Sequence, residues 1–151
     1  MAFDIESQGR FAQELIRDYK DGELIFSEGE EGRDLYIIQK GAVRISKKIS
    51  RGELELAEFK KGDFFGDMAL LQSAPRFASA RAVGHTRLVT VQPGGFLLKI
   101  RRDPTFAFEM LQQLSQRVRI ASQRALDIAE RSQISHEELQ DVWKQLERKL
   151  L

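Results

Sequence analysis

The sequence contains no cysteine, which excludes disulfide bonds, thiolate metal sites and thiol nucleophiles. It also lacks a long apolar segment, because no stretch approaches 18 uncharged apolar residues. The opening MAFDIESQGR has none of the basic, apolar and cleavage regions of a signal peptide. We therefore expect a cytoplasmic protein without a membrane span, and a reducing compartment agrees with the missing cysteine.

A net charge of one sign is absent as well. The 24 Lys and Arg residues oppose 23 Asp and Glu residues, so the formal charge is only +1. No overall field draws such a chain to nucleic acid or to an anionic membrane, and any anion site must be local. The 151 residues, of which 42% are hydrophobic and 31% are charged, have the balance of one ordinary globular domain.

The stretch from Gly22 to about Gln92 has the pattern of an antiparallel β unit. Short apolar runs at 24–26, 35–38 and 88–91 alternate with Gly, Asp and Glu. Period-two alternation at 43–46 and 53–56, on either side of Arg51-Gly52, predicts a hairpin. No helical segment long enough for a parallel crossover separates these runs. We therefore predict a mainly β, antiparallel fold over residues 22–103, with the turn spacing of a sandwich, a roll or a barrel.

Helices are predicted on both sides of the roll. In residues 1–21 the spacing of Phe11, Leu15, Ile16 and Tyr19 predicts a short amphipathic helix. The helical period returns at 96–100, and Pro104 suits the first turn of a much longer helix. Ser135-x-x-Glu138 is a capping-box pattern for a last helix with an apolar stripe. Residues 104–151 are thus expected to form the C-terminal helical region.

The long predicted helix carries an apolar seam with spacings of three and four. Its members are Leu111, Leu114, Val118, Ala121, Ala125 and Ile128. Two interpretations stay open: the seam packs on the β-roll, or it pairs with a second copy of itself.

The segment from Gly66 to Ala78 has the composition of a phosphate cradle. Gly66 permits a turn that a Cβ would obstruct, and residues 67–70 can follow as one helical turn with free amide hydrogens. Such amides attract anions, and Arg76 can close the cradle with a permanently charged fork. A carboxylate at Asp67 fits if it accepts hydrogen bonds from a sugar hydroxyl. A compact sugar phosphate would satisfy both groups.

Several spaced motifs, in one order, resemble the cyclic-nucleotide-binding domains of the catabolite activator protein and the protein kinase A regulatory subunit. The resemblance runs from about Gly22 to Arg119. Its motifs are Gly22-Glu23-Leu24-Ile25-Phe26, Glu28-Gly29-Glu30, Leu35-Tyr36-Ile37-Ile38, Gly41-Ala42-Val43-Arg44-Ile45, Gly62-Asp63-Phe64-Phe65-Gly66-Asp67 and Pro75-Arg76. The resemblance implies a β-roll that binds cyclic AMP or cyclic GMP and relays binding to its C-terminal helices.

The resemblance also implies the roles of particular residues. Arg76 and the amides near Ala69 and Leu70 would hold the cyclic phosphate, and Asp67 takes the ribose position. The cassette residues are Gly66, Asp67, Met68, Ala69, Leu70, Arg76, Phe77 and Ala78. The apolar wall for the base would be Ile45, Leu56, Phe59, with Arg124 as a candidate on the long helix.

Three positions depart from the family pattern. Asp67 stands where the family typically has Glu, and a lost ribose hydrogen bond would cost on the order of 1.5 to 3 kcal/mol, or roughly ten- to a hundredfold in affinity. Phe77 stands where the family usually has a small residue, so its ring narrows the pocket. Ala125 and Leu126 replace polar residues that cap the base. These departures favour an alternative, a nucleotide-independent scaffold for homodimerisation or partner binding.

Other chemistry finds little support in the sequence. His85 and His136 lie 51 positions apart without a partner at metal-ligand spacing, so we expect no metal site and no cofactor. No nucleophile–base pair or paired carboxylates appear, so an enzyme is the weakest interpretation. The arginines at 117–131 are interrupted by acidic residues, and the roughly 20 residues after Arg131 are too few for a winged DNA-binding domain.

Overall fold

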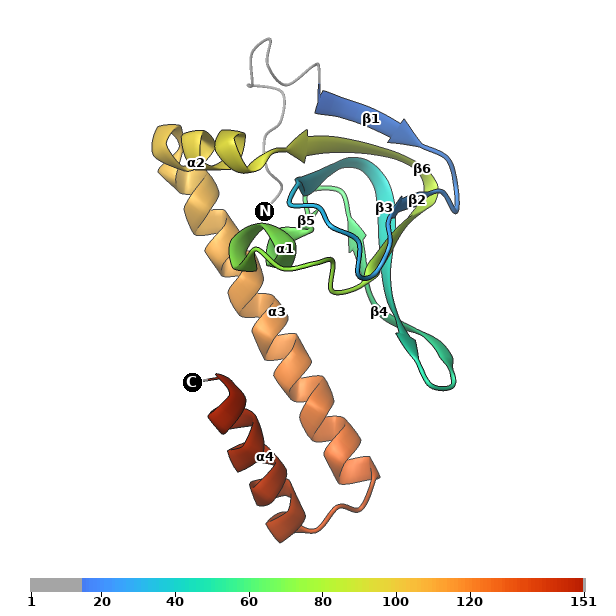
Figure 1. Ribbon diagram of the computed structural model, residues 1–151, viewed down its shortest axis with the longest axis vertical. Helices are drawn as coiled ribbons and strands as arrows, with labels where there is room; N and C mark the ends of the chain where they lie inside the picture. Colours follow the sequence, from blue (N-terminus) through green and yellow to red (C-terminus); the bar gives the residue numbers. More distant parts are fainter. Residues whose placement is uncertain (1–14, 151) are drawn as a thin grey trace. The chain divides into compact units, whose positions relative to one another are not determined.

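The computed structural model describes residues 15–150, which form six strands and four helices (Figure 1). In chain order the elements are β1 (Ile16–Tyr19), β2 (Leu24–Phe26), β3 (Leu35–Ile49), β4 (Gly52–Lys60), β5 (Phe64–Phe65), α1 (Asp67–Gln72), β6 (Ser79–Val91), α2 (Pro93–Arg102), α3 (Pro104–Arg131) and α4 (His136–Leu150). The chain divides after Ala107 into two compact units. The first unit holds every strand, and the second holds most of α3 and all of α4.

The strands form one antiparallel sheet that curls into a roll. Its path is β1-β6-β3-β4, with β2 also paired to β6 and β5 also paired to β3. The long strands β3 and β6 pair from Leu35 opposite Val91 to Ser46 opposite Ser79. The hairpin predicted at Arg51-Gly52 is confirmed, because Ile49 pairs with Gly52 across the turn. The antiparallel β-roll predicted from the sequence is confirmed.

The interior of the roll combines large aromatic side chains with small ones. The buried cluster consists of Tyr19, Phe26, Ile38, Val43, Phe65, Ala80, Ala82 and Leu88. Alanines at 78, 80 and 82 are all buried, so this part of the chain presents only methyl groups to the interior. Ile45, Phe59 and Tyr36 pack against the cluster while staying partly exposed. The apolar cluster thus extends to partly exposed side chains at the surface of the roll.

The N-terminal helix predicted over residues 11–19 is wrong where the structure describes it. Residues 11–14 lie outside the described part, but Ile16–Tyr19 form strand β1, paired with Thr86–Val89 of β6. Tyr19 is buried in the roll, and the Asp18 carboxylate accepts hydrogen bonds from Arg87 Nε at 2.9 Å and Nη2 at 3.1 Å. Ile16 and Tyr19 lie three residues apart, which matches the helical period, yet pairing with a distant strand decides the conformation.

Helix α2 and the first turn of α3 close the first unit. Pro93 lies in the first turn of α2, and Pro104 begins α3, as its restricted backbone favours. The Asp103 carboxylate accepts the Phe106 N–H at 3.2 Å and so caps α3. The rings of Phe96 and Phe106 meet edge to face, with centroids 6.2 Å apart. The helices predicted at 96–100 and from Pro104 are confirmed.

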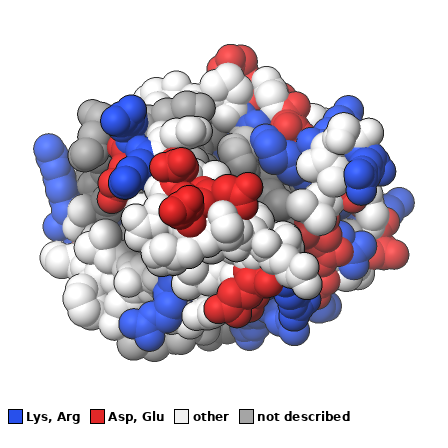
Figure 2. Space-filling view, turned by 90° about the horizontal axis from the view of Figure 1, so that it is seen from below, with Lys and Arg blue, Asp and Glu red and all other residues white. Residues whose placement is uncertain are grey.

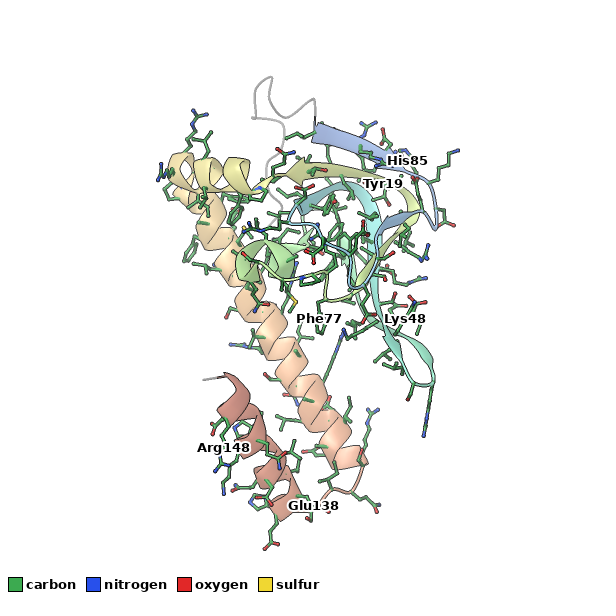
Figure 3. All side chains as sticks on the ribbon, viewed as in Figure 1. Tyr19, Lys48, Phe77, His85, Glu138 and Arg148 are labelled. Carbon is green, nitrogen blue, oxygen red and sulfur yellow. The ribbon has the colours of Figure 1, made fainter. Side chains whose placement is uncertain are left out.

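In the second unit, α3 ends at Arg131 and α4 starts after a short break. The predicted capping box is confirmed, because Ser135 Oγ accepts the Glu138 N–H at 3.2 Å and Glu138 Oε2 accepts the Ser135 N–H at 2.9 Å. Figure 3 labels Glu138 at this end of α4. Along α3, the seam residues Leu111, Val118 and Ile128 are each more than three-fifths exposed. This apolar seam is open to a partner.

Charges on the surface are mixed. On the face shown in Figure 2, acidic and basic side chains are interspersed. Within residues 15–150, no helix combines the length and the apolar content needed to cross a bilayer. The mixed charges agree with the expectation that any anion site is local.

Candidate functional site

The predicted cradle is built around a left-handed turn at Gly66. Its φ of +83° is a conformation that side-chain-bearing residues rarely adopt, and the helical turn predicted after it is confirmed as α1. A Cβ at this position would meet Asp34 O at 2.8 Å and Arg76 Nη1 at 2.9 Å. Gly66 therefore serves two purposes, since it makes the turn and lets the Arg76 guanidinium approach the backbone.

The Arg76 side chain is buried, with only 4% of its surface exposed. Its Nη1 donates to Gly66 O at 3.1 Å and its Nη2 donates to Asp34 O at 3.0 Å. The guanidinium carbon lies 4.2 Å from the centre of the Phe26 ring, at cation–π distance. On Gly32, a Cβ would come within 3.4 Å of Nη2, so this glycine keeps the loop close to the fork.

Backbone hydrogen bonds fix Arg76 to the loop that precedes β3. The Gly29 N–H donates to Arg76 O at 2.8 Å, and the Arg76 N–H donates to Glu30 O at 2.9 Å. The Glu30 carboxylate in turn accepts the Ser27 N–H at 2.8 Å and closes this turn. The arginine is therefore held by both its main chain and its side chain before any ligand arrives.

This buried cation has no anionic partner among the described residues. Its two acceptors are neutral carbonyl groups, and its Nε is buried without any hydrogen-bond partner. A buried charge is normally paired, because desolvation of an unpaired ion costs several kcal/mol. The geometry thus leaves one donor and one positive charge unsatisfied, which a phosphate oxygen can satisfy.

An aromatic cluster lies close to the Arg76 guanidinium. The rings of Tyr36 and Phe65 stack with centroids 5.2 Å apart, and Phe26 lies 5.8 Å from Tyr36. The Arg76 guanidinium carbon is 5.7 Å from the Tyr36 ring centre. Burial raises the pKa of the Tyr36 hydroxyl, while the charge of Arg76 opposes that rise. Tyr36 therefore stays protonated and leaves the positive charge of the site undiminished at neutral pH.

The remaining cassette residues divide between core and surface. Asp67 is buried in the first turn of α1, and Ala69, Leu70 and Ala78 are buried apolar residues. Met68 is 43% exposed. Asp67 thus places a carboxylate next to the glycine turn, one residue from the carbonyl that Arg76 contacts.

Phe77 differs from its neighbours because it protrudes. Arg76 and Ala78 are buried, whereas 49% of Phe77 is exposed. Lys47 Nζ lies 4.0 Å from its ring centre and donates to Phe77 O at 2.7 Å. Phe77 is labelled in Figure 3.

The predicted wall for a base lies on β3 and β4. Ile45 and Phe59 pack against the core cluster while remaining partly exposed, and Leu56 is partly buried. The pairing register skips Leu56, because Ile45 pairs with Ala57 and the next residue, Ser46, pairs with Glu55. This bulge interrupts the alternation expected at 53–56. Arg124 belongs to the second unit, on α3.

The sequence analysis missed the residues that surround Arg76. Gly32, Asp34, Phe26 and Tyr36 contact or approach its fork, and Lys47 contacts the next residue. Their separations in sequence from positions 76 and 77 range from 30 to 50 residues, so periodicity gives no sign of these contacts. Phe26 and Tyr36 lie in motifs that resemble a known family, whereas Gly32, Asp34 and Lys47 lie outside those motifs and carried no signal in the sequence.

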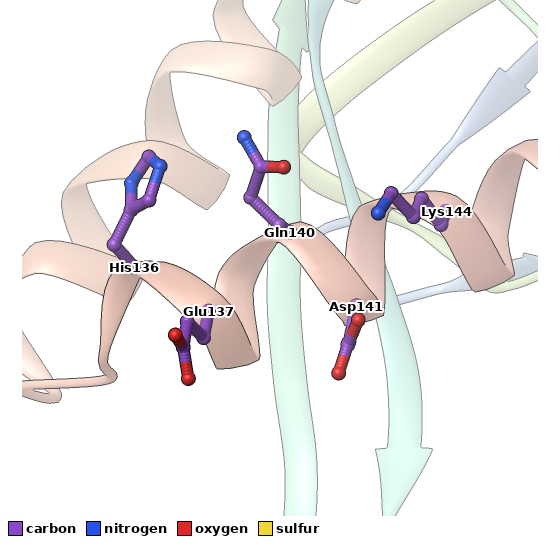
Figure 4. Close-up of a pocket in the computed structure, with 5 residues that line it drawn as sticks. All are labelled: His136, Glu137, Gln140, Asp141 and Lys144. Atoms are coloured by element: carbon purple, nitrogen blue, oxygen red, sulfur yellow. The ribbon is translucent and has the colours of Figure 1, made fainter.

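Two other places hold titratable groups. A shallow hollow of about 260 Å³ on α4 is lined by His136, Glu137, Gln140, Asp141 and Lys144, all from this one helix (Figure 4). His85 Nε2 lies 3.4 Å from Asp18 Oδ1 on the surface of the roll. Among residues 15–150 no group of three or more His, Asp or Glu side chains is placed to hold a metal. The cradle around Arg76 is the candidate site.

A model of one known family matches the roll. The matching family is described as "Cyclic nucleotide-binding domain", and the match covers residues 16–103. This region holds every strand and the cradle just described. The chain belongs to the cyclic nucleotide-binding domain family.

Among curated relatives, the cyclic AMP receptor protein of Thermus thermophilus is 38% identical over 106 residues, which cover 70% of this chain and 49% of that protein. The cAMP-dependent protein kinase regulatory subunit of Mycosarcoma maydis is 37% identical over 86 residues, 54% of this chain and 16% of that protein. The chain thus spans about half or less of the length of these relatives.

Solved structures show the same fold. The catabolite activator protein of Thermus thermophilus aligns with a TM-score of 0.67 and 34% identity, over 80% of this chain and 57% of that one. The EAL enzyme Bd1971 aligns in its cAMP-bound form with a TM-score of 0.54 and 29% identity, over 78% and 33% of the two chains. Its cGMP-bound form gives 0.53 and 33%, over 69% and 28%.

Proposed function

We propose that this domain is a regulatory module that binds a cyclic mononucleotide, cyclic AMP or cyclic GMP. The observation that carries the proposal is the buried Arg76 guanidinium, which has no anionic partner among the described residues and an unsatisfied Nε. A cyclic phosphate supplies one negative charge and the oxygen acceptors that a guanidinium prefers. Burying the arginine without a charged partner costs free energy, and a bound anion would offset that cost.

Each part of the nucleotide has a candidate partner. Arg76 and the backbone amides of the Gly66–Leu70 turn bind the phosphate, with Phe77 and Ala78 closing the cassette. Asp67 accepts a hydrogen bond from a ribose hydroxyl. The base lies against Ile45, Leu56 and Phe59. A purely apolar wall offers the base surface contact rather than hydrogen bonds.

The relatives support this ligand class. The two curated relatives are named as a cyclic AMP receptor and as the regulatory subunit of a cAMP-dependent kinase. Bd1971 has been solved in cAMP-bound and cGMP-bound forms. The names of the two curated relatives describe receptors or regulators, which favours a regulatory rather than a catalytic role for this domain.

Isothermal titration with cyclic AMP and cyclic GMP tests the ligand. We expect a dissociation constant in the micromolar range or below, which corresponds to a binding free energy of about −8 kcal/mol or more favourable. Arg76→Lys keeps the positive charge but loses the planar fork, so we expect binding to weaken by roughly ten- to a hundredfold. Arg81→Lys, a change at an exposed arginine of β6, is the matched control and should bind as the wild type does. Adenosine, which has no phosphate, should not bind.

The contrary outcome is equally clear. If neither nucleotide at millimolar concentration produces heat or raises the unfolding temperature, the domain does not bind cyclic nucleotides. The exposed α3 seam then supports the alternative, a scaffold that homodimerises or binds a partner protein.

The output of the proposed sensor is the helical region. Ligand binding can change this region only if the nucleotide favours one helix arrangement over another, because equal affinity for both transmits nothing. The seam residues Leu111, Val118 and Ile128 are exposed, and in this proposal they pair with the same residues of a second copy of the chain.

Light scattering tests this self-association. We expect a dimer that Val118→Glu converts to monomer, because two charges would face each other across the paired seams. Gln116→Glu adds the same charge to an exposed α3 residue outside the seam and should leave the dimer intact. A wild-type monomer at all concentrations contradicts pairing through the seam.

A further inference from the structure

A cluster of three side chains from separate segments lies at the end of the cassette. Lys47 Nζ on β3 donates to Glu28 Oε1 at 3.0 Å and to Phe77 O at 2.7 Å. The other carboxylate oxygen of Glu28 accepts the Lys48 N–H at 2.9 Å, and the Glu28 N–H donates to Ser79 Oγ at 2.9 Å. Both carboxylate oxygens and the N–H of Glu28 are hydrogen-bonded. The cluster thus holds the chain at Phe77, through its carbonyl, and at Ser79, through its hydroxyl.

The cluster holds the Phe77 ring in one orientation. The Lys47 ammonium lies 4.0 Å from the ring centre, which is a cation–π contact with one face of the ring. Phe77 nevertheless keeps 49% of its surface exposed, although both adjacent residues are buried. Since one face is covered by Lys47, this exposure belongs to the other face and the edge. An aromatic side chain that is held still and half exposed costs little entropy when it binds a flat ligand.

Phe77 also adjoins, in sequence, the residue whose charge is proposed to attract the phosphate. Phe77 directly follows Arg76, whose guanidinium is fixed by Gly66 O and Asp34 O. A nucleotide bound through its phosphate at Arg76 has its base one sugar away. Phe77 is exposed on the segment that leads into β6, and the residues proposed as the base wall, Ile45 and Phe59, are apolar as well.

We propose that Phe77 is a stacking platform for the base, and that Lys47 and Glu28 are positioning residues that hold the platform. The proposal rests on the cyclic-nucleotide binding proposed above and deepens it. A phenyl ring recognises the π face of a base and not its hydrogen-bonding edge. The site therefore prefers large bases over small ones and distinguishes poorly between adenine and guanine.

Titration with three nucleotides on four proteins tests the platform. On the wild type we expect cyclic AMP and cyclic GMP to bind with affinities within about threefold of each other, and cyclic CMP to bind roughly tenfold more weakly. Phe77→Leu keeps an apolar side chain but removes the ring, and should weaken both purine nucleotides about tenfold. It should also nearly abolish the preference over cyclic CMP. Phe77→Trp should restore purine binding, and Phe77→Ser is the fourth protein.

Two outcomes would overturn the platform. If Phe77→Leu binds the purine nucleotides as tightly as the wild type, the ring does not stack on the base. If Phe77→Ser binds them more tightly, the ring obstructs the pocket instead. Unfolding temperatures of all variants establish that they are folded, which the exposed position of Phe77 favours.

A double-mutant cycle tests the positioning role of Lys47. Lys47→Met keeps the alkyl chain but removes the ammonium, so purine affinity should fall about threefold in the wild type and not change in Phe77→Leu. The control is Lys48→Met, which alters the neighbouring lysine without touching the ring. An equal loss in both backgrounds would show that Lys47 contacts the ligand itself and would overturn its positioning role. A wild type that binds none of the nucleotides refutes the proposed function, whereas normal binding by Phe77→Leu refutes only the platform.

Discussion

Replacing Gly66 with alanine separates the two purposes that this glycine serves. Its φ of +83° penalises any L side chain, and its Cβ would also meet Asp34 O at 2.8 Å and Arg76 Nη1 at 2.9 Å. Gly22 offers a matched control, since its φ is +76° and a Cβ there meets nothing within 4 Å. The difference between the two variants therefore isolates the close approach of the Asp34 carbonyl and the Arg76 fork to Gly66.

The magnitudes follow from these two terms. The left-handed conformation costs about 1 to 2 kcal/mol for alanine, which is the whole effect expected for Gly22→Ala. Gly66→Ala must also displace the Arg76 fork from Gly66 O, and losing a hydrogen bond to a charged group costs about 1.5 to 3 kcal/mol. We therefore expect Gly66→Ala to lower the free energy of unfolding by about 2.5 to 5 kcal/mol.

Urea unfolding measures both variants, and titration with cyclic AMP measures the site. Gly22→Ala should bind the nucleotide normally, while Gly66→Ala, if it folds, should lose most affinity because Arg76 has moved. Equal destabilisation in the two variants, together with normal binding by Gly66→Ala, would refute the idea that this glycine admits the arginine.

Two further predictions concern side-chain contacts. The Lys48 N–H and then the Lys47 ammonium lower the pKa of the Glu28 carboxyl below its usual 4.5. The stabilisation from the Glu28 carboxylate should therefore be complete above pH 4.5 and lost as the pH falls through the lowered pKa. The unfolding temperatures of the wild type and Glu28→Gln should differ at neutral pH and converge in acid. A difference that stays constant with pH would contradict the role of the charge. Ser135→Ala removes the cap of α4 and should cost about 1 kcal/mol of helix stability, seen as lower helicity by far-UV circular dichroism, whereas Ser132→Ala should have no effect; equal helicity in both would contradict the capping role.

The sequence was most informative where local chemistry decides the conformation. Pro104 and the Ser135–Glu138 box start helices, and Gly66 makes its turn, because each depends on residues within one helical turn. The alternating residues of β3 and the turn at Arg51-Gly52 defined the hairpin in the same way. These features predicted the roll and the position of the cradle.

Contacts between distant segments were beyond such reasoning. Ile16–Tyr19 was taken for a helix because its apolar spacing fits one, but its partner strand follows about 70 residues later. The sequence indicated the importance of Arg76. Its burial against Phe26 and the absence of a hydrogen-bond partner for Nε depend on segments that are distant in sequence. Likewise, Lys47 and Phe77 meet because Ser46 pairs with Ser79, a register that emerges only from the whole sheet.

The lone buried charge of Arg76 sets up a trade-off between stability and ligand affinity. Its Nε has no hydrogen-bond partner, so the fold bears a desolvation cost, and under the proposed function a bound phosphate would offset that cost. Two carbonyl groups already hold the guanidinium, which limits the ordering that ligand binding would require. An apolar residue in place of Arg76 would therefore make the fold more stable while removing the cation on which the proposed binding depends.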